Sequence, residues 1–546
     1  MQTSAPCRKI EMRGILTDCM ITEDKMGEYF NPENDRFTKT INSEIYLDKS
    51  GLITYLNSVI QTEQEYICVS RPRRFGKSIT AAMLAAYYSS GCDSREIFRN
   101  LQITKDPQFN THLNQYNVIF INIQDFLSQS SDIDEMLDLI INDISEEMLS
   151  SYPQLTGQRF LRLLQRIYSI DRKPFIFIID EWDCVLRVYQ KDSAAQNKYL
   201  DFLRLILKDK AYVGLAYMTG ILPIKKYGTH SALNMFDEFS MTNPRQFAQY
   251  VGFTQEEVQS LCNRYQMDYL ELSAWYNGYR FKNVPAVYSP KSVISAVLSG
   301  VFSDYWNQTE TYEALKIYII MNYQGLKDDI IKLLAEDKII IDIGGFTNDM
   351  VTFSTADDVL TLLIHLGYLR YDMDTSAVSI PNKEIASEFV TAIRSAGWSE
   401  VINAVNASNE LLNATWREDN EAVAGSIQSA HLNTSILTYN NENALSYTIS
   451  LAYYSAREYY TTVREMPAGK GFADLVFLPR RNHMDKPAMV VELKWDQTAA
   501  GAIQQIKDKQ YVDALKDYGG NILLIGIVYD KETKQHECNI EKLRYA

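Results

Sequence analysis

Short apolar runs alternate with helix-like segments between residues 41 and 240. The runs that predict strands are Tyr66–Val69, Val118–Ile123, Phe175–Ile179 and Tyr212–Thr219, and the helical patterns between them include Asp132–Tyr152 and Gln158–Ile167. Strands that alternate with helices are typical of a parallel sheet covered on both faces. The first 40 residues are polar and irregular, which predicts a leader that lies on this domain.

The pattern turns mostly helical after residue 240 and then becomes mixed. A helix, a hairpin and a second helix are expected within residues 346–395, an order that resembles a winged helix. Such an arrangement can contact DNA but more often packs domains together. The expected elements are a turn at Trp275–Tyr279, a helix at Ala356–Leu366, hairpin strands at Tyr368–Tyr371 and Ala377–Ile380, a helix after Pro381, and connecting helices over residues 400–437.

Alternation of strands and helices resumes near residue 441. A chain of 546 residues is too long for one core and suggests about three or four domains. The predicted fold class is α/β multidomain, with a parallel sheet, a helical and winged-helix-like middle, and a second α/β domain. The predicted boundaries are 1–40 for the leader, 41–240 for the first domain, 241–345 for the helical region, 346–437 for the winged-helix-like part with its connecting helices, and 438–546 for the last domain.

The loop after the first predicted strand carries the strongest chemical signal, and its sequence is Arg71-Pro72-Arg73-Arg74-Phe75-Gly76-Lys77-Ser78. A strand, a tight loop that ends in Gly-Lys-Ser and a helix form a phosphate-binding loop, in which backbone amides and the helix N-terminus face the phosphates. The usual spacing places a glycine where this chain has Arg71. The predicted ATP contacts are Arg73, Arg74, Phe75, Gly76, Lys77 and Ser78, and the Ser78 hydroxyl is also a predicted Mg²⁺ ligand.

Two acids follow the apolar run Phe175–Ile179. Asp180 is placed to join the Mg²⁺ shell, and Glu181 to orient or deprotonate the attacking water. Thr219, at the end of another apolar run, is a candidate sensor of the γ-phosphate. The structural alternative for the two acids is a buried strand that ends at a solvated turn. Lys225 and Lys226 are equally compatible with contacts to phosphate, contacts to a neighbouring subunit, or a position on the surface.

Four segments together resemble the bacterial AAA-ATPase-like family: Tyr46–Lys49, Arg71–Ser78, Thr219–Ile224 and Trp275–Tyr279. In that family the Arg-Pro-Arg-Arg-Phe-Gly-Lys-Ser loop is itself the hallmark. The resemblance therefore implies that Arg71 is a family trait. It covers about residues 40–290, and it implies that a nuclease-like domain often follows.

The last domain places acidic and basic residues on two neighbouring strands. Asp474 lies in the predicted strand Gly471–Phe477, and Glu492 and Lys494 share one face of the strand Ala488–Lys494. The two carboxylates can bind a divalent cation, while Lys494 activates water and stabilises the charge of the transition state. The alternative is a structural salt bridge, but the apolar neighbours indicate burial, where unpaired charges cost several kcal/mol.

An Asp, a hairpin and Glu-x-Lys resemble the core of the PD-(D/E)XK nuclease superfamily, whose fold is restriction-endonuclease-like. The resemblance implies a Mg²⁺ or Mn²⁺ site and a nucleic-acid substrate. It also implies roles for Gln505 and Tyr511 in the helix after the core, and for Glu442 as an extra acidic metal ligand. Glu465 is a weaker candidate for that ligand.

Composition limits the remaining possibilities. The formal net charge of −15 argues against a chain that coats nucleic acid, although residues 440–546 carry 14 basic and 14 acidic residues and are neutral. Seven scattered cysteines without a Cys-x-x-Cys pair favour reduced thiols in the cytoplasm over a zinc site. No apolar segment approaches the roughly 20 residues of a membrane helix. A cytoplasmic protein that does not enter membranes is therefore expected, and a homo-oligomer is compatible with the sequence.

Three hypotheses follow from the sequence. The first is a P-loop ATPase coupled to a metal-dependent nuclease. The second is an ATP-dependent binding or signalling switch whose nuclease-like domain recognises a partner without cutting. The third is a nucleotide-binding module without turnover.

Overall fold

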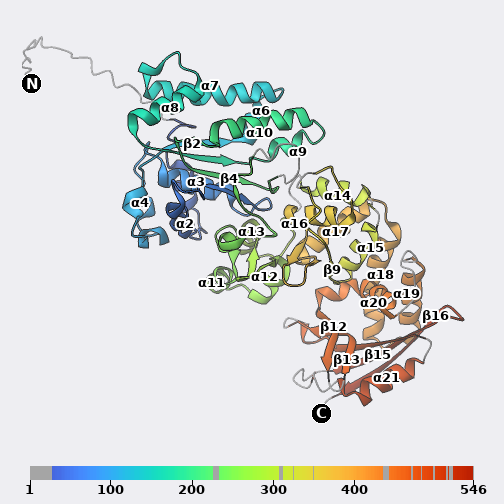
Figure 1. Ribbon diagram of the computed structural model, residues 1–546. Coiled ribbons are helices and arrows are strands. Elements are labelled where there is room, and N and C mark those ends of the chain that lie inside the picture. Colours follow the sequence, from blue (N-terminus) through green and yellow to red (C-terminus); the bar gives the residue numbers. More distant parts are fainter. Residues whose placement is uncertain are drawn as a thin grey trace, which may run out of the picture.

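In the computed structural model, two five-stranded sheets lie at opposite ends of the chain, with helices and two smaller sheets between them (Figure 1). The α/β multidomain fold class predicted from the sequence is confirmed. The described residues are 27–544 except 225–232, 307–310, 322, 324, 348–349, 434–441, 469–470, 481–482, 496–497, 512–514 and 516–520.

The N-terminal sheet has five parallel strands in the order β2-β3-β4-β1-β5. Alternate side chains of β1, which lies between β4 and β5, enter two different cores: Ile67 and Val69 pack on one face, and Tyr66 and Cys68 on the other. Both faces are therefore buried, as the apolar runs predict. The strands are β1 (Tyr66–Ser70), β2 (Asn117–Asn122), β3 (Phe175–Asp180), β4 (Val213–Gly220) and β5 (Asp237–Phe239).

Helices cover this sheet on both sides, with α2–α4 on one side and α6–α8 and α10 on the other (Figure 1). The long predicted helix is present as α7, and the side chain of Asp132 caps it by accepting the amides of Asp134 and Glu135. The helices are α1 (Asp35–Ile41), α2 (Gly51–Val59), α3 (Lys77–Tyr88), α4 (Arg95–Phe98), η1 (Gln102–Lys105), α5 (Phe109–His112), α6 (Ile123–Gln129), α7 (Ile133–Ser151), η2 (Pro153–Leu155), α8 (Phe160–Asp171), α9 (Cys184–Val188) and α10 (Ser193–Leu207).

A small module follows, in which helices pack on a three-stranded antiparallel sheet of order β6-β8-β7. The turn predicted at Trp275–Tyr279 is wrong: Trp275 and Tyr276 end α12, and Asn277 opens β7. Pairing between β7 and β8 across the chain reversal overrides the turn signal of the Asn-Gly pair. The elements are η3 (Arg245–Gln249), β6 (Phe253–Thr254), α11 (Gln255–Tyr265), α12 (Tyr269–Tyr276), β7 (Asn277–Phe281), β8 (Val284–Tyr288) and α13 (Pro290–Ser299).

The middle of the chain contains the predicted helix, hairpin and helix. A capping box opens α16, and Gly367, in the left-handed region, ends it. The hairpin strands pair antiparallel, and a third short strand, β9, joins them. The elements are α14 (Thr311–Met321), α15 (Leu326–Leu334), β9 (Ile339–Ile340), α16 (Ala356–Leu366), β10 (Arg370–Asp372), β11 (Ala377–Ser379), α17 (Lys383–Ser395), α18 (Ser399–Trp416) and α19 (Asn420–Asn433).

The C-terminal sheet is mixed, with the order β12-β13-β14-β15-β16. Only β14 and β15 run parallel, and α21 packs against both of them. The elements are α20 (Glu442–Ala452), η4 (Tyr454–Glu458), β12 (Tyr460–Ala468), β13 (Gly471–Pro479), β14 (Ala488–Trp495), α21 (Ala499–Asp508), β15 (Asn521–Asp530) and β16 (Gln535–Arg544).

Candidate functional site

Arg71, which stands where a glycine is usual, is a buried anchor of the loop. Its side chain is fully buried, and Nη1 donates to the carbonyl oxygens of Ser70 at 2.9 Å and Phe239 at 2.8 Å. The guanidinium also lies over the Phe281 ring, 5.5 Å from its centroid. Burial lowers the pKa of Arg71 to about 10, so the side chain stays charged at neutral pH. Arg71 therefore ties β1 to β5 and to the module that contains β7.

The rest of the loop turns into α3 at Gly76. This residue has φ +89°, in the left-handed region that favours glycine, and Lys77 begins the helix. The Lys77 ammonium is 5% exposed and donates to the Pro72 carbonyl at 3.0 Å. Burial lowers the pKa of Lys77, while Glu181 and Asp180 act in the opposite direction. Lys77 thus lies near both predicted acids.

The two acids occupy different environments at the end of β3. Asp180 is 1% exposed and accepts hydrogen bonds from the Glu181 amide, at 3.0 Å, and from the Ser78 hydroxyl. Burial raises the pKa of Asp180. Glu181 has φ +53°, and its carboxylate accepts from Arg187 Nη2 at 2.6 Å. The backbone turn therefore directs the two adjacent carboxylates differently.

Arg187 bridges two acids and was not singled out in the sequence. Its Nε also donates to Asp183 Oδ2 at 3.1 Å, and Asp183 accepts the Leu222 amide at 2.9 Å. The carboxylates of Asp183 and Glu181 raise the pKa of Arg187 and so keep it charged. The spacing of Asp183 and Arg187 on one helical turn was the available signal.

A cavity of about 810 Å³ lies against the loop. It is lined by Arg73, Arg74, Gly76, Lys77, Ser78 and Glu181, and also by Asn122 at the end of β2, Gln124 of α6, and Lys291 and Ile294 of α13. The structure thus brings the predicted loop and Glu181 to one cavity. Asn122 follows an apolar strand as Asp180 does, a signal that was overlooked, whereas Lys291 comes from a separate module.

Three predicted residues lie away from that cavity. Thr219 is fully buried beside Asp180 in the sheet, and its hydroxyl has no hydrogen-bond partner among the described residues. Phe75 is buried against Tyr279, with ring centroids 5.2 Å apart. Asp180 does not line the cavity but accepts a hydrogen bond from the hydroxyl of Ser78, which does. Arg74, which does line the cavity, has φ +70° and donates to the Tyr305 carbonyl at 2.6 Å.

The carboxylates and the lysine of the last domain meet in its sheet. Glu492 is 1% exposed, and Lys494 Nζ donates to its Oε1 at 2.9 Å. Gln505 of α21 donates to the same oxygen. Asp474 Oδ2 accepts the Leu493 amide at 2.7 Å. Lys494 and Gln505, both proposed from the sequence, therefore hold the Glu492 carboxylate, and Asp474 bonds the backbone next to it.

This arrangement fits a divalent cation. Glu492 Oε2 is buried without a hydrogen-bond partner among the described residues. Burial raises the pKa of Glu492, and so does the charge of Asp474, which must lie close. Hard oxygen ligands of this kind suit Mg²⁺ or Mn²⁺. In the described part of the chain no group of three acidic, His or Cys residues could hold a metal, so water or phosphate would complete the coordination.

The remaining predicted residues are less central. Glu442 begins α20, but its side chain lies outside the part of the chain that the structure describes. Lys225 and Lys226 both lie outside the described residues. Glu465 is exposed in β12. Tyr511 is 1% exposed, and its hydroxyl is 3.0 Å from where a Cβ on Gly471 would stand.

Comparisons with known proteins match the two segments of the chain that contain these residues. Residues 35–229 match the family model of predicted AAA-ATPases, and residues 441–539 match that of the PD-(D/E)XK nuclease superfamily. These matches imply the use of a nucleotide and of a divalent metal.

A curated relative is the "uncharacterized protein in vnfD 5'region" of Azotobacter chroococcum mcd 1, 23% identical over 514 residues, which are 90% of this chain and 93% of the relative. Similar solved structures are those of the Aeropyrum pernix ORC2 protein as ADPNP–ADP complexes and in the ADP form. Their identities are 11% and 10% and their TM-scores 0.30 and 0.25, and each covers 66% of this chain and 98% of the solved chain. Within the described residues, no helix has the length and apolar character needed to cross a membrane.

Proposed function

We propose that this protein binds and hydrolyses ATP and couples that cycle to a metal-dependent nuclease. The observation that carries the proposal is Glu492: a buried carboxylate with one oxygen held by Lys494 and the other without a hydrogen-bond partner among the described residues. Burying a carboxylate oxygen without a partner lowers the stability of the folded protein by several kcal/mol. A bound ligand would offset that cost. The nuclease superfamily match covers the same strands.

ATP would occupy the cavity of about 810 Å³ beside the loop. Lys77 would exchange its bond to the Pro72 carbonyl for phosphate oxygens, and α3 would present its N-terminal amides. Ser78 and Asp180 would hold Mg²⁺, which would neutralise part of the negative charge of the phosphates. Glu181 would orient the attacking water once Arg187 releases its carboxylate. Its ion pair with Arg187 therefore occupies the carboxylate of the proposed base in this structure.

Phosphodiester hydrolysis would take place at the C-terminal sheet. A divalent cation held by Asp474 and Glu492 would supply Lewis-acid activation of water and phosphate. Lys494, now paired with Glu492, would stabilise the negative charge that develops on the phosphate. Gln505 would orient Glu492 from α21. Asp474 is steadied for this task by the Leu493 amide.

The test is a cleavage assay on the purified full chain. Plasmid DNA, single-stranded DNA and RNA are incubated with Mg²⁺ or Mn²⁺, with and without ATP, and ATP hydrolysis is followed in the same samples. Asp474→Asn removes a charge but keeps an acceptor for the Leu493 amide, so the fold is retained. Asp474→Asn and Lys494→Ala are each expected to lower cleavage at least about 100-fold, and Glu537→Gln, an exposed acid on β16, to leave it unchanged.

Each hypothesis predicts a different outcome. Cleavage that survives both Asp474→Asn and Lys494→Ala overturns the proposed nuclease site. ATP hydrolysis that is lost in Lys77→Ala, without cleavage of any substrate by the wild type, supports the non-cutting switch instead. Turnover that is unchanged in Glu181→Gln removes Glu181 as the base.

A further inference from the structure

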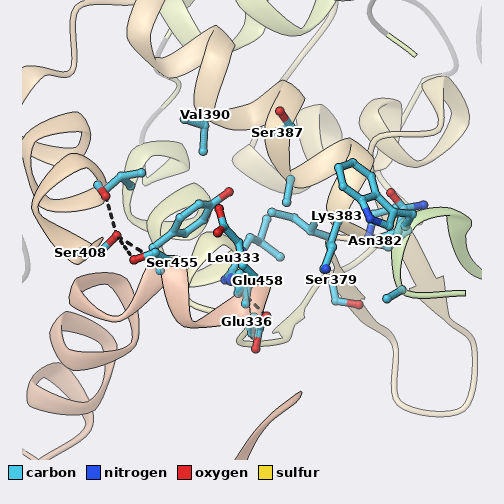
Figure 2. A pocket seen from close by; sticks show the side chains of 18 of the residues that line it. Leu333, Glu336, Ser379, Asn382, Lys383, Ser387, Val390, Ser408, Ser455 and Glu458 are labelled. Atoms are coloured by element: carbon cyan, nitrogen blue, oxygen red, sulfur yellow. Dashed lines mark hydrogen bonds and ion pairs between the residues drawn. The ribbon is translucent and has the colours of Figure 1, made fainter. Parts of the chain in front are cut away.

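A second cavity, of about 730 Å³, lies where the middle of the chain meets the C-terminal domain. Figure 2 shows Lys383, Ser387 and Val390 from α17 on one side and Ser408, Ser455 and Glu458 from the other elements facing them. The wall also includes the ends of α12, α15 and β11, the start of β10, parts of α18 and η4, and Arg480 after β13. Segments more than 200 residues apart in the sequence therefore line one cavity.

The cavity is positively charged inside an acidic protein. Its lining includes five basic residues and two acidic ones, Glu336 and Glu458, although the whole chain has a formal net charge of −15. Arg457 is paired with Glu336 at 3.1 Å, which compensates that charge. The basic residues are Lys338, Arg370, Lys383, Arg457 and Arg480.

Two of these cations share one carboxylate. Glu271 lies 3.3 Å from Lys383 Nζ and 3.7 Å from Arg480 Nη1, and it also accepts the Trp275 indole at 3.0 Å. Both distances exceed the 2.7–2.9 Å of a good charge-assisted hydrogen bond. The side chains of Lys383 and Arg480 are each only 18% exposed. Glu271 is thus shared, at long range, by two partly desolvated cations, while Glu458 also favours the charged form of Lys383 and Glu336 that of Arg480.

A third cation, Arg370, is held by a neutral partner. Its Nε and Nη2 donate to the hydroxyl of Ser379 at 3.1 and 2.8 Å. Asp372 favours its charged form, while burial and the nearby Arg280 lower its pKa. Burial likewise lowers the pKa of Lys383 and of Arg480. An anion bound in the cavity would add negative charge beside Arg370, Lys383 and Arg480.

We propose that this cavity binds a phosphate-bearing anion of nucleotide size through Arg370, Lys383 and Arg480. Guanidinium forks and an ammonium are the groups that recognise phosphate oxygens. A volume of about 730 Å³ falls within the range of small-molecule sites, and a wall built from seven helices and strands suits a compact ligand better than a continuous strand.

Occupancy of the cavity would join the C-terminal domain to the middle of the chain. Arg480 follows a strand of the C-terminal sheet, whereas Arg370 and Lys383 belong to the winged-helix-like part. A ligand held by all three would hold these parts at a fixed distance. The inference goes beyond the proposed function and does not depend on cleavage, because the ligand is bound and not cut.

The test is calorimetric titration of the full chain with defined probes. Lys77→Ala is the background, because it removes phosphate binding at the loop. The probes are pyrophosphate, AMP and the dinucleotide pApA, with a 20-nucleotide single strand as the macromolecular comparison. At least one small probe is expected to bind with one site per chain and a Kd below about 1 mM. The double change Lys383→Gln and Arg480→Gln is expected to weaken it at least tenfold.

Two further variants separate a site from a folding defect. Ser387→Trp fills the cavity from an exposed position without removing a charge, and it is expected to abolish binding while thermal unfolding is unchanged. Arg394→Gln changes an exposed cation of the same helix outside the cavity and is expected to bind normally. Absence of saturable binding by all three small probes, full affinity in Ser387→Trp, or binding of the 20-nucleotide strand alone overturns the proposal.

Discussion

Arg71→Gly restores the glycine that a phosphate-binding loop usually has, and we expect it to damage this protein. The guanidinium is fully buried and donates to the carbonyls of Ser70 and Phe239. Glycine supplies neither donor. The substitution therefore leaves two carbonyls without their donors and opens a void beside Phe281.

The magnitude follows from these contacts. A hydrogen bond from a charged donor contributes about 1.5–3 kcal/mol, so two such bonds contribute about 3–6 kcal/mol. Glycine adds about 0.5–1 kcal/mol through the greater entropy of the unfolded chain, while the removal of a desolvated cation offsets part of the loss. We expect the free energy of unfolding to fall by about 3 kcal/mol, or roughly 10 °C in the midpoint for a domain of this size.

The assay is thermal unfolding followed by circular dichroism, together with ATP affinity from titration. Arg73→Gln serves as the matched control, because Arg73 belongs to the same loop but is only half-buried and lines the cavity. It is expected to weaken ATP binding with little change in the midpoint. An Arg71→Gly protein that melts within about 2 °C of the wild type would refute the anchoring role.

Two other substitutions test buried groups. Thr219→Val removes a hydroxyl that has no hydrogen-bond partner among the described residues. We therefore expect the midpoint of thermal unfolding to stay the same or rise, and ATP turnover to fall about tenfold. A lower midpoint would contradict this expectation. Burial and Asp304 raise the pKa of Glu388 to about 8, from 4.5 for the ordinary side chain. The folded protein then holds a proton that the unfolded chain releases, so stability from this group is present below about pH 4.5 and is lost as the pH rises towards 8. Melting scans from pH 5 to 8 should show a smaller decline in Glu388→Gln, and equal slopes would contradict the protonated state.

Local patterns predicted much of the fold. The strands β1–β4 begin and end within one residue of the apolar runs, because burial on both faces of a parallel sheet demands continuous apolar sequence. The helix Ala356–Leu366 is recovered with both ends, since a capping Thr and a terminal Gly mark them. The grouping of Asp474, Glu492, Lys494 and Gln505 also follows from strand alternation and a neighbouring helix.

Contacts between distant segments could not be predicted in the same way. Arg71 donates to a carbonyl 168 residues further along the chain, and nothing near it in the sequence signals that acceptor. Lys291 reaches the loop cavity from a module whose strands were themselves not expected. A single sequence carries apolar periodicity but not the packing of one module on another, so such residues appear only in three dimensions.

One path of contacts joins the two cavities and gives the proposals a common physical basis. Arg74, in the loop, donates to the Tyr305 carbonyl, and the Tyr305 amide donates to Glu384 at 2.8 Å. Glu384 is 1% exposed and adjacent in sequence to Lys383, which lines the second cavity. A nucleotide that draws Arg74 towards phosphate would disturb this path, and a ligand on Lys383 would disturb it from the other end. Because coupling between two sites is reciprocal, ATP must change the affinity of the second cavity by the same factor by which that ligand changes the affinity for ATP.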